Sequence, residues 1–246
     1  AIFVVKESEA ITYNYERDTE DPRIAHSLNI KFDEYDNVLE SASVVYPRKI
    51  MNTIPAQVRI DAQDETYITF IVNTFTGNEF NENDIYRLRL PVETKTYQLK
   101  GVKREPESKS FYSLSDFKDI INKSEEVLYH QLDTEPDNTV STPTNYKPIK
   151  RLIEHFRTTY RNNDLTDQLP LGKIDSLGIP YESYQLAYTK ELLHEIYNSK
   201  KTDSELVDLM IEGKFFSSDN DTKWWIPSGT TNFIDATNPD ANTLEK

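Results

Sequence analysis

The chain has 246 residues, a formal net charge of −14 and no cysteine. Such an acidic surface repels phosphate backbones and anionic lipid headgroups, so binding to nucleic acid or to a membrane surface is disfavoured. The lack of cysteine excludes disulfide frameworks, thiolate nucleophiles and cysteine-based zinc sites.

The N-terminal part predicts antiparallel strands. Apolar residues occupy every second position in residues 11–15, 28–32 and 38–46, a pattern typical of strands with one buried face. The 15 Tyr, 11 Phe and only 6 Gly of the chain also favour a folded, β-rich body over disorder.

The turn within residues 33–37 fixes the register of the first hairpin. A three-residue loop with a left-handed Asp36 sets Phe32 opposite Val38 and keeps both apolar sets on one face. A two-residue turn would shift the pairing of the two strands by one residue. The apolar side chains of the two strands would then lie on opposite faces of the hairpin. The chosen register also sets Leu28 opposite Ala42 and leaves Glu40 opposite Ile30.

Further elements follow along the chain. Strands are predicted at residues 66–75, 85–90, 92–99 and 182–188, and again from Trp224. A helical pattern begins at Ser113, and an apolar stripe at helical spacing predicts a helix over residues 149–160. Two short helices are predicted with N-caps at Thr189 and Thr202, the second with a capping box and Gly213 just past its end.

These elements predict a mainly β fold with helical insertions, of the α+β class, built from antiparallel hairpins. Residues 1–132 form the β-rich region, with short helices near 113–130. Residues 133–147 lack periodicity and are the predicted linker. Residues 148–246 form a mixed helix and strand region, with a frayed tail from about residue 238.

Six segments carry a resemblance to a known family. They are YxYER-x₄-DPRIAH (residues 13–26), DEYDNVL-x-SA (33–42), LPVETKTYQL (90–99), RLIEHFRTTYRNNDL (151–165), LPLGKIDSLGIPYESYQLAYT (169–189) and WWIPSG (224–229). The chain resembles the middle-to-C-terminal part of the B component of the tripartite Tc insecticidal toxin complexes of bacteria. One departure is Asp36, where that family usually has Gly.

The resemblance implies a secreted, extracellular structural role. In that family, B and C components close RHS-type β-sheet strips into a hollow shell around the toxic part of C. A β-propeller elsewhere in B docks the shell onto the A component. The C component with its cargo, and the A component through the rest of the parent chain, are therefore the implied partners.

No residue pattern assigns a catalytic, cofactor-binding or metal site. His194-Glu195 begins like a metalloprotease helix, but the second histidine position holds Asn198. Asp219 and its two neighbours begin like a calcium loop that then lacks its glycine and glutamate. The glycine pair 172 and 178 has neither the spacing nor the lysine of a phosphate loop. His155 is expected to be packed or hydrogen-bonded.

Two other features leave alternatives open. The basic residues Lys147, Lys150, Arg151, Arg157 and Arg161 form either a docking surface for an acidic neighbour or a solvated helix face. Trp224 and Trp225 point to opposite faces of a strand, so at most one joins a given core.

The sequence thus favours a non-catalytic structural fragment. A binding module that recognises a glycan or a host protein through exposed aromatics such as Trp225 and Tyr15 is the alternative. A hydrolase with an unrecognised carboxylate pair is a third reading, since 42 acidic residues form many chance pairs.

Overall fold

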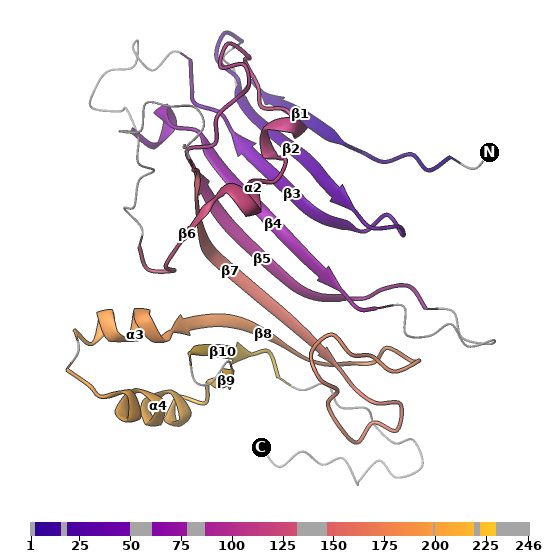
Figure 1. Cartoon of the computed structure of the whole chain (residues 1–246), viewed down its shortest axis with the longest axis vertical. Helices are drawn as coiled ribbons and strands as arrows, with labels where there is room; N and C mark the ends of the chain where they lie inside the picture. Colours follow the sequence, from indigo (N-terminus) through magenta and orange to yellow (C-terminus); the bar gives the residue numbers. More distant parts are fainter. Residues whose placement is uncertain are drawn as a thin grey trace. The chain divides into compact units, whose positions relative to one another are not determined.

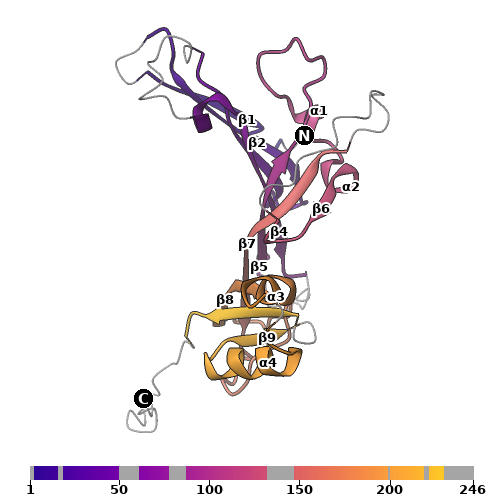
Figure 2. The same cartoon turned by 90° about the vertical axis from the view of Figure 1, so that its left-hand side faces the viewer.

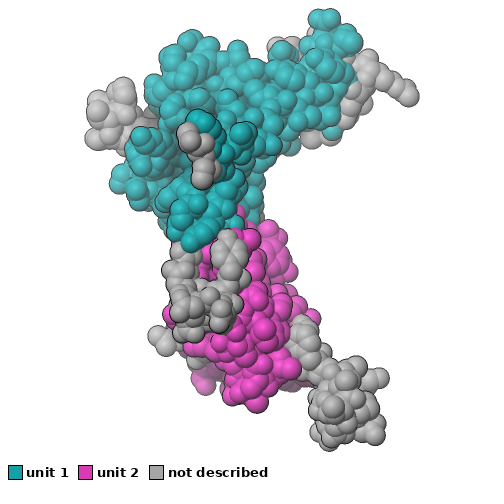
Figure 3. All heavy atoms as spheres, turned by 90° about the vertical axis from the view of Figure 1, so that its right-hand side faces the viewer, with its two compact units in different colours: residues 1–72, 95–153 teal, residues 73–94, 154–246 magenta. Residues whose placement is uncertain are grey.

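The structure, a computed structural model, describes residues 3–15, 19–49, 61–77, 87–131, 147–198, 200–218 and 222–229. Contacts divide the chain into two compact units (Figure 3). Unit 1 is Ala1–Val72 with Lys95–Ile153, and unit 2 is Asn73–Thr94 with Glu154–Lys246.

The described residues are mainly antiparallel strands (Figure 1), hydrogen-bonded in the order β1-β2-β3-β4-β5-β7-β8-β10-β9, with β6 parallel to β7. Few short helices accompany them, so the predicted mainly β fold class is confirmed. The strands are β1 (Glu9–Asn14), β2 (Arg23–Phe32), β3 (Val38–Val45), β4 (Tyr67–Phe75), β5 (Pro91–Lys100), β6 (Glu125–Val127), β7 (Ile149–Tyr160), β8 (Pro180–Thr189), β9 (Phe216–Ser218) and β10 (Lys223–Pro227).

The β2–β3 hairpin of unit 1 has the predicted three-residue loop. Phe32 pairs with Val38, and Asp36 has φ of 70°. The Asp33 carboxylate accepts hydrogen bonds from the N–H groups of Tyr35 and Asn37, both at 2.9 Å, which holds the turn. Leu28 pairs with Ala42, also as predicted.

One detail of that hairpin was wrong. Glu40 lies opposite Lys31 and not opposite Ile30, because the register shifts on both sides of Lys31. This β-bulge turns Lys31 toward the carboxylate, and Lys31 Nζ lies 3.2 Å from Glu40 Oε1. Glu40 also pairs with Val72, which packs against the core, so Lys31 partners an acidic residue at the margin of that core.

The core of unit 1 lies on one face of its strands. There β2, β3, β4 and β5 contribute buried residues such as Leu28, Val44, Phe70 and Leu99. A charged segment, residues 101–127, covers this face through residues that include Phe117. It contains two one-turn helices, α1 (Leu114–Phe117) and α2 (Ile120–Lys123), which lie on one side of the strands (Figure 2).

Unit 2 places helices α3 (Lys190–Ile196) and α4 (Asp203–Glu212) after β8. Both predicted N-caps are confirmed. The Thr189 side chain accepts from the Leu192 N–H, and Thr202 with Glu205 forms a capping box. Gly213 is the C-cap of α4. Leu193, Leu206, Met210 and Trp224 form the core under the helices.

Two element predictions were wrong. Residues 149–160 form β7 and not a helix. This strand lies between β5 and β8, and the pairing on both sides outweighs the helical spacing of its apolar residues. Residues 87–90 lie outside any strand, and residues 85 and 86 lie outside the described residues, as do most of the predicted linker, residues 219–221 and the predicted tail.

No helix within the described residues is long and apolar enough to span a bilayer.

Candidate functional site

A polar cluster in unit 2 gathers residues far apart in the sequence around the Glu93 carboxylate. Glu93 Oε1 lies 2.9 Å from His155 Nε2 and accepts a 2.7 Å hydrogen bond from Arg157 Nε. The Arg157 guanidinium stacks over the Trp225 ring at 4.3 Å, and the His155 ring meets that ring edge-on at 4.8 Å. Ser218 Oγ accepts from Trp225 Nε1 at 2.7 Å. Arg157, His155 and Trp225 thus hold one another in place.

A cavity of about 520 Å³ adjoins this cluster, also within unit 2. Its lining is largely apolar and aromatic, with Leu169, Phe216 and Trp225 among its residues. Tyr184 also lines it, and its hydroxyl donates to Glu182 Oε2 at 2.7 Å. Burial and this hydrogen bond raise the pKa of Tyr184 well above its usual value, so the phenol stays neutral.

The chemistry available in this cluster is limited. Ser218 Oγ already accepts hydrogen bonds from the Trp225 indole and from Arg157, so it is not poised beside a general base as an activated nucleophile would be. The Glu93 carboxylate is engaged by the Arg157 guanidinium and by His155. The geometry is that of a packed structural network.

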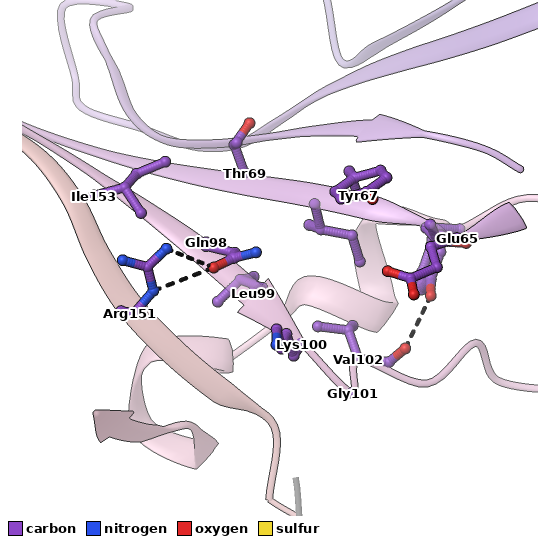
Figure 4. Close-up of a pocket in the computed structure, with 13 residues that line it drawn as sticks. Glu65, Tyr67, Thr69, Gln98, Leu99, Lys100, Gly101, Val102, Arg151 and Ile153 are labelled. Carbon is purple, nitrogen blue, oxygen red and sulfur yellow. Dashed lines mark hydrogen bonds between the residues drawn. The ribbon is translucent and has the colours of Figure 1, made fainter. Parts of the chain in front are cut away.

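Unit 1 contains a second cavity, of about 580 Å³, lined by the first residues of β4, the last of β5 and the first of β7 (Figure 4). Arg151 and Gln98 point toward one another in it, and Gln98 Oε1 accepts from Arg151 Nε at 3.2 Å and Nη2 at 2.9 Å. Arg151 Nη1 also donates to the Tyr129 carbonyl. Among the described residues that line this cavity, none is His, Ser or Cys.

Residues 101–127 do not cover the opposite face of the unit 1 strands. On strands β1 to β4, three cross-strand rows of this face contain no charged residue. We call it the serine face. The pairing of β1 to β4 defines its rows as Ala10, Ser27, Ser43 and Thr69; then Thr12, Ala25, Val45 and Tyr67; and finally Asn29, Ser41 and Ile71. All eleven side chains are exposed or half-buried. Sequence reasoning missed this face, because each row combines residues from strands far apart along the chain.

The histidines are dispersed. His26 is buried, with Nδ1 3.0 Å from the Tyr46 hydroxyl, and His130 is half-buried after β6. His155 is packed and hydrogen-bonded as expected, although on a strand. His194 lies on α3, 2.8 Å from Asp203 Oδ1. Across the ranges that the structure describes, no three His, Asp or Glu side chains gather as metal ligands would.

Both tryptophans are buried, and the register of β10 against β8 shifts between them. Trp224 packs beneath the helices, whereas Trp225 packs against His155 and Arg157. A role for Trp225 as an exposed anchor was therefore wrong, because none of its surface is exposed. Tyr15 is 50% exposed and stacks on Tyr13, with ring centroids 6.4 Å apart.

The basic residues do not form a helix face, since they lie on or beside β7. Lys150 pairs with Glu126 at 3.2 Å, and Arg151 and Arg157 bind Gln98 and Glu93. Arg161 is buried beneath the Tyr181 ring, 4.7 Å from its centroid. Most of these basic side chains therefore bind groups within the protein, and less positive charge remains for an external partner.

Comparisons with known proteins add to this geometry. The family model described as "Insecticide toxin TcdB middle/C-terminal region" matches residues 1–99. No curated protein sequence matches the chain significantly. Three solved structures match its fold: TcdB2-TccC3 (15% identity, 89% of this chain, TM-score 0.56), TcdB2-TccC3-TEV (16%, 92%, 0.61) and the Photorhabdus luminescens Tc holotoxin pore (16%, 91%, 0.59).

The chain spans 10% of the length of each of these solved chains. Its fold is therefore a segment of the β-sheet architecture found in Tc toxin structures. Residues 1–99 resemble the TcdB middle/C-terminal region, and the rest of the chain lies outside that match. The resemblance to the Tc toxin B component is thereby confirmed.

Proposed function

We propose that the chain is a non-catalytic structural fragment of a toxin-complex B component. It contributes to the hollow RHS-type shell that encloses the toxic part of the C component and helps to deliver it. Its partners are the C component with its cargo and, through the rest of the parent chain, the A component. The assembly acts outside the producing cell, and this fragment contacts neither nucleic acid nor a membrane.

The open edge at β1 is the observation that carries this proposal. Among the described strands, β1 pairs only with β2, and all six of its residues are exposed. Ile11 and Tyr13 are 37% and 42% exposed on the core-facing side of this edge. An edge strand with exposed apolar side chains is a template for pairing with further strands. A wall built from neighbouring strands supplies such partners.

The absence of catalysis is proposed from the two cavities described above. In unit 2 the polar groups around Glu93 bind one another, and in unit 1 Arg151 binds Gln98 and a carbonyl. Among the described residues, Asp164, Asp203 and Glu205 have pKa values that hydrogen bonds displace downward at exposed positions. A general acid at neutral pH needs the opposite displacement.

Co-purification of the full-length parent B component with its C component tests the structural role. Tyr13→Lys places a charge at the β1 edge and is expected to lower the yield of the B–C complex and the protection of its cargo from protease. Tyr35→Lys is the matched control, because Tyr35 is 43% exposed at a hairpin tip. Circular dichroism and a thermal melt establish that both variants fold. Unchanged yield and protection with Tyr13→Lys would contradict a place for β1 in the wall.

A further inference from the structure

The guanidinium of Arg151 is held in the unit 1 cavity by neutral groups. Gln98 Oε1 accepts hydrogen bonds from its Nε at 3.2 Å and its Nη2 at 2.9 Å, and the Tyr129 carbonyl accepts one from Nη1 at 2.9 Å. Within the described ranges, no Asp or Glu forms a salt bridge with this side chain. By contrast, Arg48 binds the Asp21 carboxylate at 2.8 Å. Arg151 therefore keeps an uncompensated positive charge in the cavity.

The same three hydrogen bonds fix the position of this charge. They join β7 to Gln98 on β5 and to the segment after β6, so the guanidinium is ordered before any ligand arrives. A guanidinium has five N–H groups, and these bonds use three of them. One N–H on Nη1 and one on Nη2 remain for an anion. Figure 4 shows Arg151 and Glu65 at opposite ends of the lining, so the acidic group of the cavity lies away from this cation.

The rest of the lining sets the class of anion. Its cations are Lys100 and Arg151 and its acid is Glu65, so two positive charges and one negative charge leave +1. One carboxylate ligand balances this charge, whereas the nearly two negative charges of a phosphate exceed it. Tyr67 and Ile153 add apolar surface, and a volume of about 580 Å³ suits a drug-sized molecule. An organic acid with an apolar body fits both the charge and the walls.

We propose that the unit 1 cavity is a binding site for an organic carboxylate. The anionic group binds the Arg151 guanidinium, and the apolar body lies against Tyr67 and Ile153. The chain as a whole carries a charge of −14, which disfavours anions over most of its surface, so a fixed cation without a carboxylate is the place where such a ligand gains most. This inference does not rest on the proposed shell role.

Binding of pyrenebutyrate to the intact protein that contains this chain tests the site. Pyrenebutanol is the matched uncharged probe, since it has the same body with a hydroxyl in place of the carboxylate. Fluorescence anisotropy is expected to show that the butyrate binds at least about tenfold more tightly than the alcohol, the gain typical of hydrogen bonds to a charged group. Equal affinity of the two probes would overturn the proposal, because the apolar body alone would then account for binding.

Gln98→Glu is the sharpest variant, because it turns a neutral acceptor into a carboxylate of nearly the same shape that neutralises Arg151 in place. The affinity for pyrenebutyrate is expected to fall about tenfold or more, while a thermal melt shows no loss of stability. Gln185→Glu is the matched control, since it makes the same change at an exposed position of β8 in unit 2 and should alter the affinity less than about twofold. Arg151→Gln removes the cation itself and should give the same loss as Gln98→Glu. Unchanged binding in Gln98→Glu, or an equal loss in Gln185→Glu, would overturn the proposal.

Competition against bound pyrenebutyrate identifies the source of the carboxylate. The competitors are naphthaleneacetate, a free organic acid, and a capped tripeptide amide with glutamate between two leucines. The same tripeptide with glutamine is its uncharged control. Displacement by the glutamate peptide and not by the glutamine peptide assigns a peptide side chain as the ligand, and displacement by naphthaleneacetate alone assigns a free acid. Displacement by neither would overturn the carboxylate site.

Discussion

Phe32 lies opposite Val38 across the β2–β3 hairpin, and this pairing depends on a left-handed Asp36, with φ of 70°. Only the odd-numbered loop brings the two apolar side chains to the same face. The backbone of one acidic residue at the turn thus sets the face on which the whole hairpin buries its apolar side chains.

Asp36→Gly is expected to raise the free energy of unfolding by up to about 1 kcal/mol, because glycine adopts positive φ without steric cost. Loss of the 2.9 Å ion pair between Lys6 Nζ and Asp36 Oδ1 reduces this gain. Asp36→Val is expected to destabilise, since a β-branched residue resists positive φ. Urea unfolding measures both, with Lys6→Ala as the control for the ion pair. Equal stability of the Gly and Val variants would contradict the turn.

Thr202→Ala removes the N-cap of α4 and is expected to lower the free energy of unfolding by about 1 kcal/mol. In the native chain the Thr202 hydroxyl accepts from the Glu205 N–H, and the Glu205 carboxylate accepts in return from the Thr202 N–H at 2.8 Å. Thr202→Ser keeps the hydroxyl and serves as the control. If Ala and Ser have the same effect in urea unfolding, the cap contributes nothing.

The start of α4 is expected to weaken in acid. A hydrogen bond from Lys190 lowers the pKa of Asp203 below its ordinary value of 3.8, and the Thr202 N–H lowers the pKa of Glu205 below its ordinary value of 4.5. Because the folded values are depressed, this stabilisation is present above pH 4.5 and is lost as the pH falls through the folded values. Thermal melts from pH 7 to pH 3 should show Asp203→Asn with Glu205→Gln less stable than the native chain at pH 7 and converging on it in acid. A constant difference at every pH would contradict this linkage.

Removal of the Glu93 carboxylate is expected to be costly. Glu93→Ala removes the carboxylate that His155 Nε2 and Arg157 Nε contact, which should cost about 3 kcal/mol. Glu93→Gln keeps a hydrogen-bond acceptor and should cost less. Glu126→Ala is the control, because Glu126 is 55% exposed in its pair with Lys150 and such surface pairs contribute little. Equal losses for Glu93→Ala and Glu126→Ala would show that the cluster is not a stabilising network.

The fragment is expected to give only background rates with generic esterase, phosphatase, glycosidase and protease substrates. The reason is that the polar groups beside both cavities bind one another. Turnover that disappears on substitution of a single carboxylate or histidine would overturn the non-catalytic proposal. Substitution of Glu182 or of His155 is the sharpest such test of turnover. Glu182 binds Tyr184, which lines the unit 2 cavity, and His155 binds Glu93 in the polar cluster.

The parts of the fold that sequence predicts well are those governed by local chemistry. Alternation and turn geometry located β2, β3 and β4, and the side-chain chemistry of Thr189 and Thr202 located the helix starts. Residues 149–160 were misassigned because their apolar residues fall at helical spacing, while the pairing of β7 with β5 and β8 cannot be seen in the sequence. Ile149 and His155 are buried there, while Phe156 is 37% exposed, so its burial follows the sheet and not the helical stripe.

The candidate surfaces were harder to predict. Glu93 and Arg157 are 64 residues apart, and their contact depends on two strands that sequence alone does not pair. The register shifts on both sides of Lys31 are not predicted by any turn rule. Ser27 and Ser43 look like ordinary strand residues until the register sets them in one row.

Strands β4, β5 and β7 contribute residues to both compact units, which has a consequence for dissecting the parent protein. No single cleavage point separates the units into independent halves. A truncation just before Ile149 would remove β7 and leave β5 with an unprotected edge, a ready template for aggregation. Segment exchange between related toxins is therefore expected to succeed only when the swapped piece carries all three of these strands together.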